Sequence, residues 1–134
     1  MIHLDTSLLV DLLREAGRGM EGPASQFLAS VPDEELGISV FVVCELAAGA
    51  AMSTRPALEK RRVDRLCEGL RIDYPDERFA PAYGSLLASQ ERRGRRISTM
   101  DLLIATSALV AGAPLVTRNA KDFSRVPGLD VLTY

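Results

Sequence analysis

Short apolar segments alternate along this chain with longer segments in which apolar residues recur at helical spacing. The first short segment is Ile2-His3-Leu4, and it is followed by Leu8, Leu9, Leu12 and Leu13. Leucines three and four positions apart lie on one face of a helix, so this stretch is predicted to be an amphipathic helix. The alternation predicts further strands at about 36–40, 70–73, 115–117 and 130–132, and helices at about 24–31, 56–69, 76–93 and 98–112.

Strands that alternate with helices in this way predict a parallel sheet covered on both faces, so the expected fold class is α/β. The chain has 134 residues, which is the size of one domain. No linker, internal repeat or low-complexity segment interrupts the pattern. We therefore expect a single domain over residues 1–134.

The composition is that of a globular protein, with 47% hydrophobic and 25% charged residues. No apolar run approaches the roughly 20 residues needed to cross a bilayer, and Asp5 and Asp11 interrupt the N-terminal apolar segment. We therefore expect a cytoplasmic protein without a membrane span. A net charge of −2 argues against binding nucleic acid through bulk charge. All but two of the 16 basic residues are arginine, which suits phosphate recognition, although a general compositional bias explains the same excess.

Cysteine and histidine chemistry finds little support. Cys44 lies in an apolar run and is predicted to be a buried core thiol, and no metal-binding spacing accompanies it or Cys67. The sole histidine, His3, is expected to be a hydrogen-bonded strand residue. Neither a Ser-His-Asp nor a Cys-His mechanism is therefore indicated.

Three carboxylates stand alone in apolar stretches. Asp5 follows the first strand, Glu45 lies in a helix directly after the second, and Asp101 lies in the first turn of the helix at 98–112. A buried carboxylate is costly unless it is paired, neutralised or bound to a cation. Asn119 follows a further strand, and in open parallel sheets ligands bind beyond the carboxyl ends of the strands. We predict that these side chains converge on one crevice and share a divalent cation, for which oxygen ligands favour Mg²⁺ or Mn²⁺.

Each of the three acids also has a structural interpretation. Asp5 is placed to cap the first helix, and Ser98 and Asp101 fit a capping box. Glu45 could form an ion pair with a distant arginine.

Four further polar residues near these acids have two interpretations each. Asn119 could coordinate a cation or orient a water, and Asp122 could supply a fourth carboxylate or cap a turn. Thr6 and Ser7 could hydrogen-bond Asp5, but helix capping is the simpler interpretation. Acids among polar neighbours are instead predicted to be solvated: Asp11, Glu15, Asp64 and Glu68.

Four segments carry these residues: Ile2-His3-Leu4-Asp5-Thr6-Ser7, Glu45-Leu46, Asp101-Leu102-Leu103-Ile104-Ala105, and Leu115-Val116-Thr117-Arg118-Asn119 with Asp122-Phe123. In this order and spacing they resemble the PIN-domain nucleases, and in particular the VapC-type toxins of bacterial toxin–antitoxin pairs. The resemblance extends over nearly the whole chain.

The resemblance implies a three-layer α/β/α sandwich around a mostly parallel sheet and a metal-dependent endoribonuclease. Asp5, Glu45 and Asp101 would form an acidic core that binds Mg²⁺ or Mn²⁺. The family's fourth acidic position falls on Asn119, a departure for which Asp122 could compensate. The resemblance also implies a homodimer and a VapB-type antitoxin whose tail fills the acidic groove.

Arginines that lie close to these acids in the sequence are predicted to contact RNA phosphates: Arg92, Arg93, Arg95, Arg96 and Arg118. A solvated helix end is the alternative for the group at 92–96. Two other functions compete with the nuclease, a metal-dependent α/β phosphatase and a non-catalytic interaction domain. Ser7 stands where a haloacid-type phosphatase would need a second aspartate, whereas Asn119 is the feature that favours a loss of catalysis.

Overall fold

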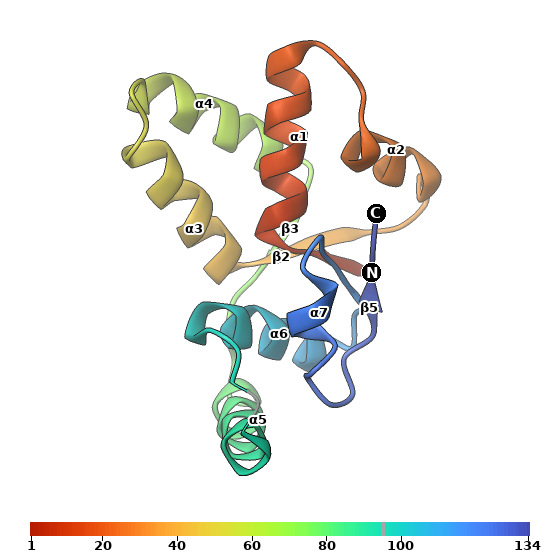
Figure 1. Ribbon diagram of the computed structural model, residues 1–134. Coiled ribbons are helices and arrows are strands. Elements are labelled where there is room, and N and C mark those ends of the chain that lie inside the picture. Colours follow the sequence, from red (N-terminus) through yellow and green to blue (C-terminus); the bar gives the residue numbers. More distant parts are fainter. Residues whose placement is uncertain (95) are drawn as a thin grey trace.

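The computed structural model describes residues 1–94 and 96–134, and a parallel sheet lies at its centre (Figure 1). Within these residues the sheet has five strands in the order β3-β2-β1-β4-β5, and every neighbouring pair is parallel. The strands are β1 (Ile2–Leu4), β2 (Leu36–Ser39), β3 (Arg71–Asp73), β4 (Leu115–Val116) and β5 (Val131–Leu132). The predicted α/β class with a parallel sheet is confirmed.

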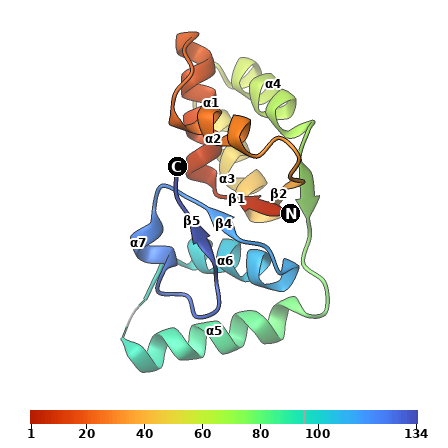
Figure 2. The same ribbon diagram turned by 90° about the vertical axis from the view of Figure 1, so that its right-hand side faces the viewer.

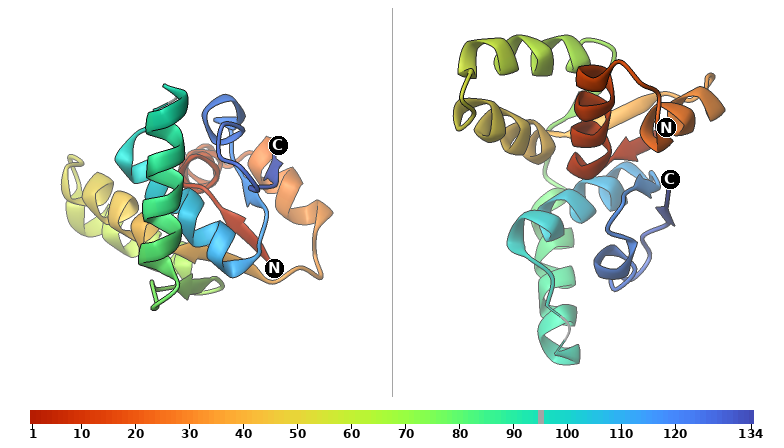
Figure 3. Two further views of the ribbon diagram at one scale, coloured as in Figure 1. Left: turned by 90° about the horizontal axis from the view of Figure 1, so that it is seen from below. Right: turned by 45° about the horizontal axis from the view of Figure 1, so that its top comes forward.

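Helices cover both faces of this sheet. Four follow β1 and β2 and lie together on one side: α1 (Thr6–Arg18), α2 (Pro23–Ser30), α3 (Val40–Ala51) and α4 (Pro56–Cys67) (Figures 1 and 2). The other side carries α5 (Phe79–Arg93), α6 (Thr99–Ala111) and the short α7 (Ala120–Phe123). Seen from below, α5 runs across the lower face of the molecule (Figure 3). The predicted three-layer sandwich is therefore confirmed.

The helices change side because the chain changes direction across the sheet. From β1 it steps outward to β2 and then β3, returns to β4 beside β1, and continues to β5. A right-handed crossover places a helix on one face for one direction of travel and on the opposite face for the other. The helices that follow β1 and β4 therefore lie on opposite faces of the sheet. At such a switch point the carboxyl ends of neighbouring strands open a crevice for ligands.

The core lies between the sheet and both helical layers. Leu4, Leu8, Ile38 and Val116 are among its fully buried side chains. Central parallel strands are apolar on both faces because helices cover both. His3 is a buried polar exception.

The predicted role of His3 as a satisfied strand residue is confirmed. Its Nε2 lies 2.7 Å from Asp73 Oδ2, so the ring joins β1 to the edge strand β3. Burial lowers the pKa of His3, and the hydrogen bond to Asp73 partly opposes that shift.

The predictions that Cys44 is buried and that Glu15 is solvated are wrong. Cys44 is exposed, because α3 turns that side chain away from the sheet. Glu15 is not freely solvated: its carboxylate accepts hydrogen bonds from the backbone N–H groups of Gly22, Ala24 and Ser25. It thereby satisfies the open N-terminus of α2, and the Ser25 hydroxyl bond is the main cause that lowers the pKa of Glu15.

No helix within residues 1–94 and 96–134 is long and apolar enough to cross a membrane.

Candidate metal centre

Asp5 lies at the carboxyl end of β1, and its side chain is only 5% exposed. It occupies the N-cap position of α1 but makes no side-chain capping bond, so the capping interpretation fails for the carboxylate. Instead, Oδ2 accepts hydrogen bonds from Thr117 Oγ1 at 2.6 Å and from Ser7 Oγ at 3.0 Å. No donor in the described part of the chain reaches Oδ1. The two hydroxyls therefore orient the carboxylate and leave one oxygen for another partner.

Glu45 lies on the second turn of α3 and is partly buried. Its Oε1 accepts a hydrogen bond of 2.6 Å from the hydroxyl of Thr6, the residue that follows Asp5. Among the described residues Glu45 forms no ion pair with an arginine, so this alternative is not observed. Thr6 and Ser7 contact acidic side chains and do not cap α1, which corrects the capping interpretation for both.

Asp101 lies in the first turn of α6, and its backbone N–H donates to Ser98 Oγ at 3.2 Å, so the predicted cap is present. Burial raises the pKa of Asp101, and the negative charges of Asp5, Glu45 and Asp122 raise it further against the opposing hydrogen bond from Ser98. The carboxyl of Asp101 therefore lies near the other acids, in the first turn of α6. Acidic side chains from four separate segments of the sequence thus lie near one another at one end of the sheet.

Asn119 and Asp122 lie on the far side of this cluster, at the start of α7. The Asn119 side chain is exposed, and its Nδ2 donates to Asp122 Oδ2 at 3.0 Å. Its backbone N–H donates to Thr117 Oγ1 at 2.9 Å, so Thr117 is bonded to both Asn119 and Asp5. Thr117 was not singled out in the sequence, although it is the polar residue that ends the apolar segment Leu115-Val116.

The donor chemistry of this cluster fits a hard divalent cation. Asp5, Glu45, Asp101 and Asp122 offer carboxylate oxygens, and burial together with the negative charge of the neighbouring acids raises the pKa of Asp101. In the described part of the chain, no three His, Cys, Asp or Glu side chains already close around one point. Mg²⁺ is commonly held by one or two carboxylates and several waters, so it does not need such a closed group.

The arginines predicted to contact RNA have different surroundings. Arg92 and Arg93 are exposed on the last turn of α5, whereas Arg96 is paired with Glu91 at 2.6 Å. Arg95 lies outside the described residues. In Figure 2 the C-terminal end of α5 lies on the side of the molecule where α7 lies. Arg118 is 57% exposed, but its Nη1 is bonded to both carboxylate oxygens of Asp11, at 2.7 and 2.8 Å.

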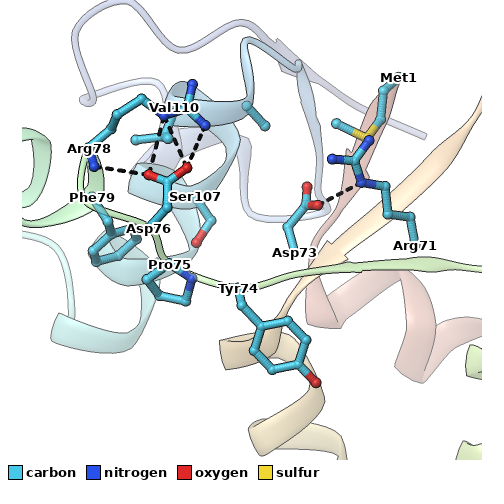
Figure 4. Close-up of a pocket in the computed structure, with 11 residues that line it drawn as sticks. Met1, Arg71, Asp73, Tyr74, Pro75, Asp76, Arg78, Phe79, Ser107 and Val110 are labelled. Atoms are coloured by element: carbon cyan, nitrogen blue, oxygen red, sulfur yellow. Dashed lines mark hydrogen bonds and ion pairs between the residues drawn. The ribbon is translucent and has the colours of Figure 1, made fainter.

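The cavity in Figure 4 lies away from the acid cluster, between the end of β3, the start of α5 and the second half of α6. It has a volume of about 250 Å³. Its arginines are already paired, Arg71 with Asp73 and Arg78 with Asp76 (Figure 4). None of the predicted site residues lines it.

A cleft of about 320 Å³ adjoins Glu45 between α1, α3 and α4. Its apolar lining residues include Val10, Leu13, Leu46 and Val63, and Arg62 and Glu59 also line it. Apolar surface therefore lies directly beside Glu45.

Fold and site together define an α/β protein with an acidic cluster at the carboxyl end of its parallel sheet. The PIN domain family matches residues 2–129, so the chain belongs to this family. Ribonuclease VapC1 from Haemophilus influenzae is 32% identical over 126 residues, which is 94% of this chain and 92% of that protein. The tRNA(fMet)-specific endonuclease VapC from Salmonella typhimurium is 30% identical over 94 residues, 70% of this chain and 71% of that protein.

Similarity to solved structures extends over the whole chain. In the crystal structure of VapBC2 from Rickettsia felis, bound to a DNA fragment from their promoter, one chain superposes with a TM-score of 0.91 at 28% identity. The superposition covers 100% of this chain and 99% of that one. The predicted family is confirmed.

Proposed function

We propose that this protein is a metal-dependent endoribonuclease that acts as the toxin of a VapBC pair. The observation that carries the proposal is the partly buried carboxyl of Asp101, which lies near enough to Asp5, Glu45 and Asp122 for their negative charges to raise its pKa. Such a cluster is stable only if protons or a cation offset its charge. The relatives of this length are ribonucleases by name, and the acidic cluster provides the chemistry that such an activity needs.

Mg²⁺ is the cation that we propose, with Mn²⁺ as an alternative. Asp5 would bind it through Oδ1, while Thr117 and Ser7 hold Oδ2. Asp101 and Glu45 would add carboxylate oxygens, directly or through water, and Thr6 orients Glu45 for this role. When bound, the cation lowers the pKa of a coordinated water and offsets negative charge on the phosphate.

Asn119 and Asp122 complete the site in this proposal. Because the Asn119 amide donates to Asp122, its carbonyl oxygen is left to accept a hydrogen bond or to bind the cation. The carboxylate of Asp122 adds a fourth negative charge near Asp101. We assign Asn119 to water or substrate positioning and Asp122 to the metal.

The acidic cluster repels RNA, so phosphates must be held by basic residues around it. We propose that Arg92 and Arg93 at the end of α5, with Arg95 and Arg96 after it in the sequence, supply these contacts. Arg118 would join them from the other side of the cluster through the part of its guanidinium that Asp11 does not hold. Phosphate contacts of this kind hold the strand without selecting its sequence.

The partners in this proposal are a VapB-type antitoxin and a second copy of the chain, in the cytoplasm. The apolar cleft beside Glu45 supports the antitoxin, because a peptide lying there would reach the acidic cluster. Size-exclusion chromatography with light scattering tests the homodimer, and a monomer at micromolar concentration would contradict it.

RNA cleavage by the purified full-length protein tests the enzymatic part of the proposal. We expect cleavage of initiator tRNA or a structured RNA with Mg²⁺, no cleavage with excess chelator, and none from Asp101→Asn. Asp64→Asn is the matched control, because Asp64 is exposed, pairs with Lys60 within α4, and is not among the acids whose charge raises the pKa of Asp101. Cleavage in excess chelator, or full activity of Asp101→Asn, would overturn the proposal. Hydrolysis of p-nitrophenyl phosphate without RNA cleavage would favour the phosphatase.

A further inference from the structure

Asp11, on the second turn of α1, joins three segments that are far apart in the sequence. Its carboxylate accepts hydrogen bonds from Arg118 Nη1 at 2.7 and 2.8 Å and from the Tyr134 hydroxyl at 2.6 Å. The Asp11 side chain is only 18% exposed, so the prediction that it is solvated is wrong. Burial, followed by the bond to Asp11, raises the pKa of Tyr134, so its hydroxyl remains a donor near neutral pH.

Arg118 connects this group to the acidic cluster through its backbone. Its N–H donates to Ser7 Oγ at 3.1 Å, and Ser7 Oγ donates to Asp5 Oδ2. The preceding residue is Thr117, whose hydroxyl donates to the same oxygen of Asp5. The position of residues 117–118 therefore determines how the hydroxyls of Thr117 and Ser7 are placed against Asp5.

We propose that Asp11 is a positioning residue for the metal centre, which acts by holding Arg118 and Tyr134. With both partners in place, Thr117 and Ser7 keep Oδ2 of Asp5 engaged and leave Oδ1 to bind the cation. The proposal rests on the metal-binding function argued above. It also gives the Arg118 guanidinium a role that does not require contact with RNA.

A purely electrostatic role for Asp11 makes different predictions. If Asp11 only adds negative charge near the cation, Asp11→Asn weakens metal binding, whereas Arg118→Ala strengthens it by removing a positive charge. Tyr134→Phe changes no charge and would then have no effect. In the positioning role all three substitutions weaken binding, because each breaks the same network.

Isothermal titration of the full-length protein with Mn²⁺ separates the two roles. We expect Asp11→Asn, Arg118→Ala and Tyr134→Phe each to weaken Mn²⁺ binding by about 3- to 10-fold, less than the roughly 10- to 100-fold typical of residues bonded directly to a ligand. Cleavage by Asp11→Asn and Tyr134→Phe at low Mn²⁺ should fall in parallel and recover at saturating Mn²⁺. Asp64→Asn should bind as the wild type, and circular dichroism shows whether each variant is folded.

The proposal is overturned if Tyr134→Phe binds Mn²⁺ as the wild type does and Arg118→Ala binds it as well or more tightly. In that case the wild type still binds Mn²⁺ and cleaves RNA, so the proposed function stands. A wild-type protein that binds no Mn²⁺ would overturn both the proposed function and the inference.

Discussion

Replacing Thr117 by valine removes one hydroxyl from the buried side of the acidic cluster and little else. Thr117 is fully buried, and its hydroxyl donates to the nearly buried Asp5 at 2.6 Å. A hydrogen bond to a charged group contributes about 1.5–3 kcal/mol to stability. The backbone N–H of Asn119 also loses its acceptor, but Asn119 is exposed and water can replace it. We therefore expect Thr117→Val to destabilise the metal-free protein by about 1.5–3 kcal/mol.

Urea denaturation followed by circular dichroism measures this loss. With a denaturant dependence of about 2 kcal/mol per molar urea, the midpoint should fall by about 0.8–1.5 M. Thr106→Val is the matched control, because Thr106 is equally buried but its hydroxyl donates to the Leu102 carbonyl within α6. The Leu102 carbonyl is neutral, so Thr106→Val should lower the free energy of unfolding by only about 0.5–1.5 kcal/mol. If Thr117→Val lowers the free energy of unfolding no more than Thr106→Val does, the Thr117 hydroxyl does not stabilise a charged Asp5, and the prediction is wrong.

Three further predictions concern charge. Because folding raises the pKa of Asp101, the ionised carboxylate destabilises the metal-free protein at higher pH. Asp101→Asn should therefore have a higher melting temperature than the wild type at pH 7. The difference should vanish below the pKa of the unfolded chain, near 3.8. Mg²⁺ at about ten times its dissociation constant should stabilise the wild type by about 1.4 kcal/mol and Asp101→Asn much less, measured by thermal melting. Because folding lowers the pKa of Glu15, Glu15→Gln should lower the melting temperature at pH 7, with the loss disappearing as the pH falls through that lowered pKa; an equal loss at low pH would contradict this.

Much of the fold could be predicted from local patterns. The apolar segment at Ile2–Leu4 and the leucines behind it are enough to indicate β1 and α1, because burial on one or both faces leaves a periodic trace in the sequence. The predicted boundaries differ from the observed ones by a few residues at helix ends. The helix α7 was not expected, because four residues carry no periodic signal.

The candidate site could be predicted in part for a related reason. Asp5, Glu45 and Asp101 each stand out because a carboxylate among apolar neighbours is costly, and that cost is a local property of the sequence. Glu15 and Asp11 do not stand out, since with Arg14 they form the polar face of the amphipathic helix α1. Their partners are the N-terminus of α2, Arg118 and Tyr134, and only the folded chain brings these groups together.

The sequence by itself determined where helices and strands alternate, most of the apolar positions that enter the core, and which acids lack local compensation. These properties depend only on each residue and its near neighbours along the chain, so they can be predicted from the sequence. The tertiary structure decided which oxygen of Asp5 the hydroxyls of Ser7 and Thr117 occupy, and that Asp11 holds Arg118 and Tyr134. Hydrogen bonds act over about 3 Å, so partners more than 100 positions apart are chosen only when the strand order β3-β2-β1-β4-β5 brings the segments into contact.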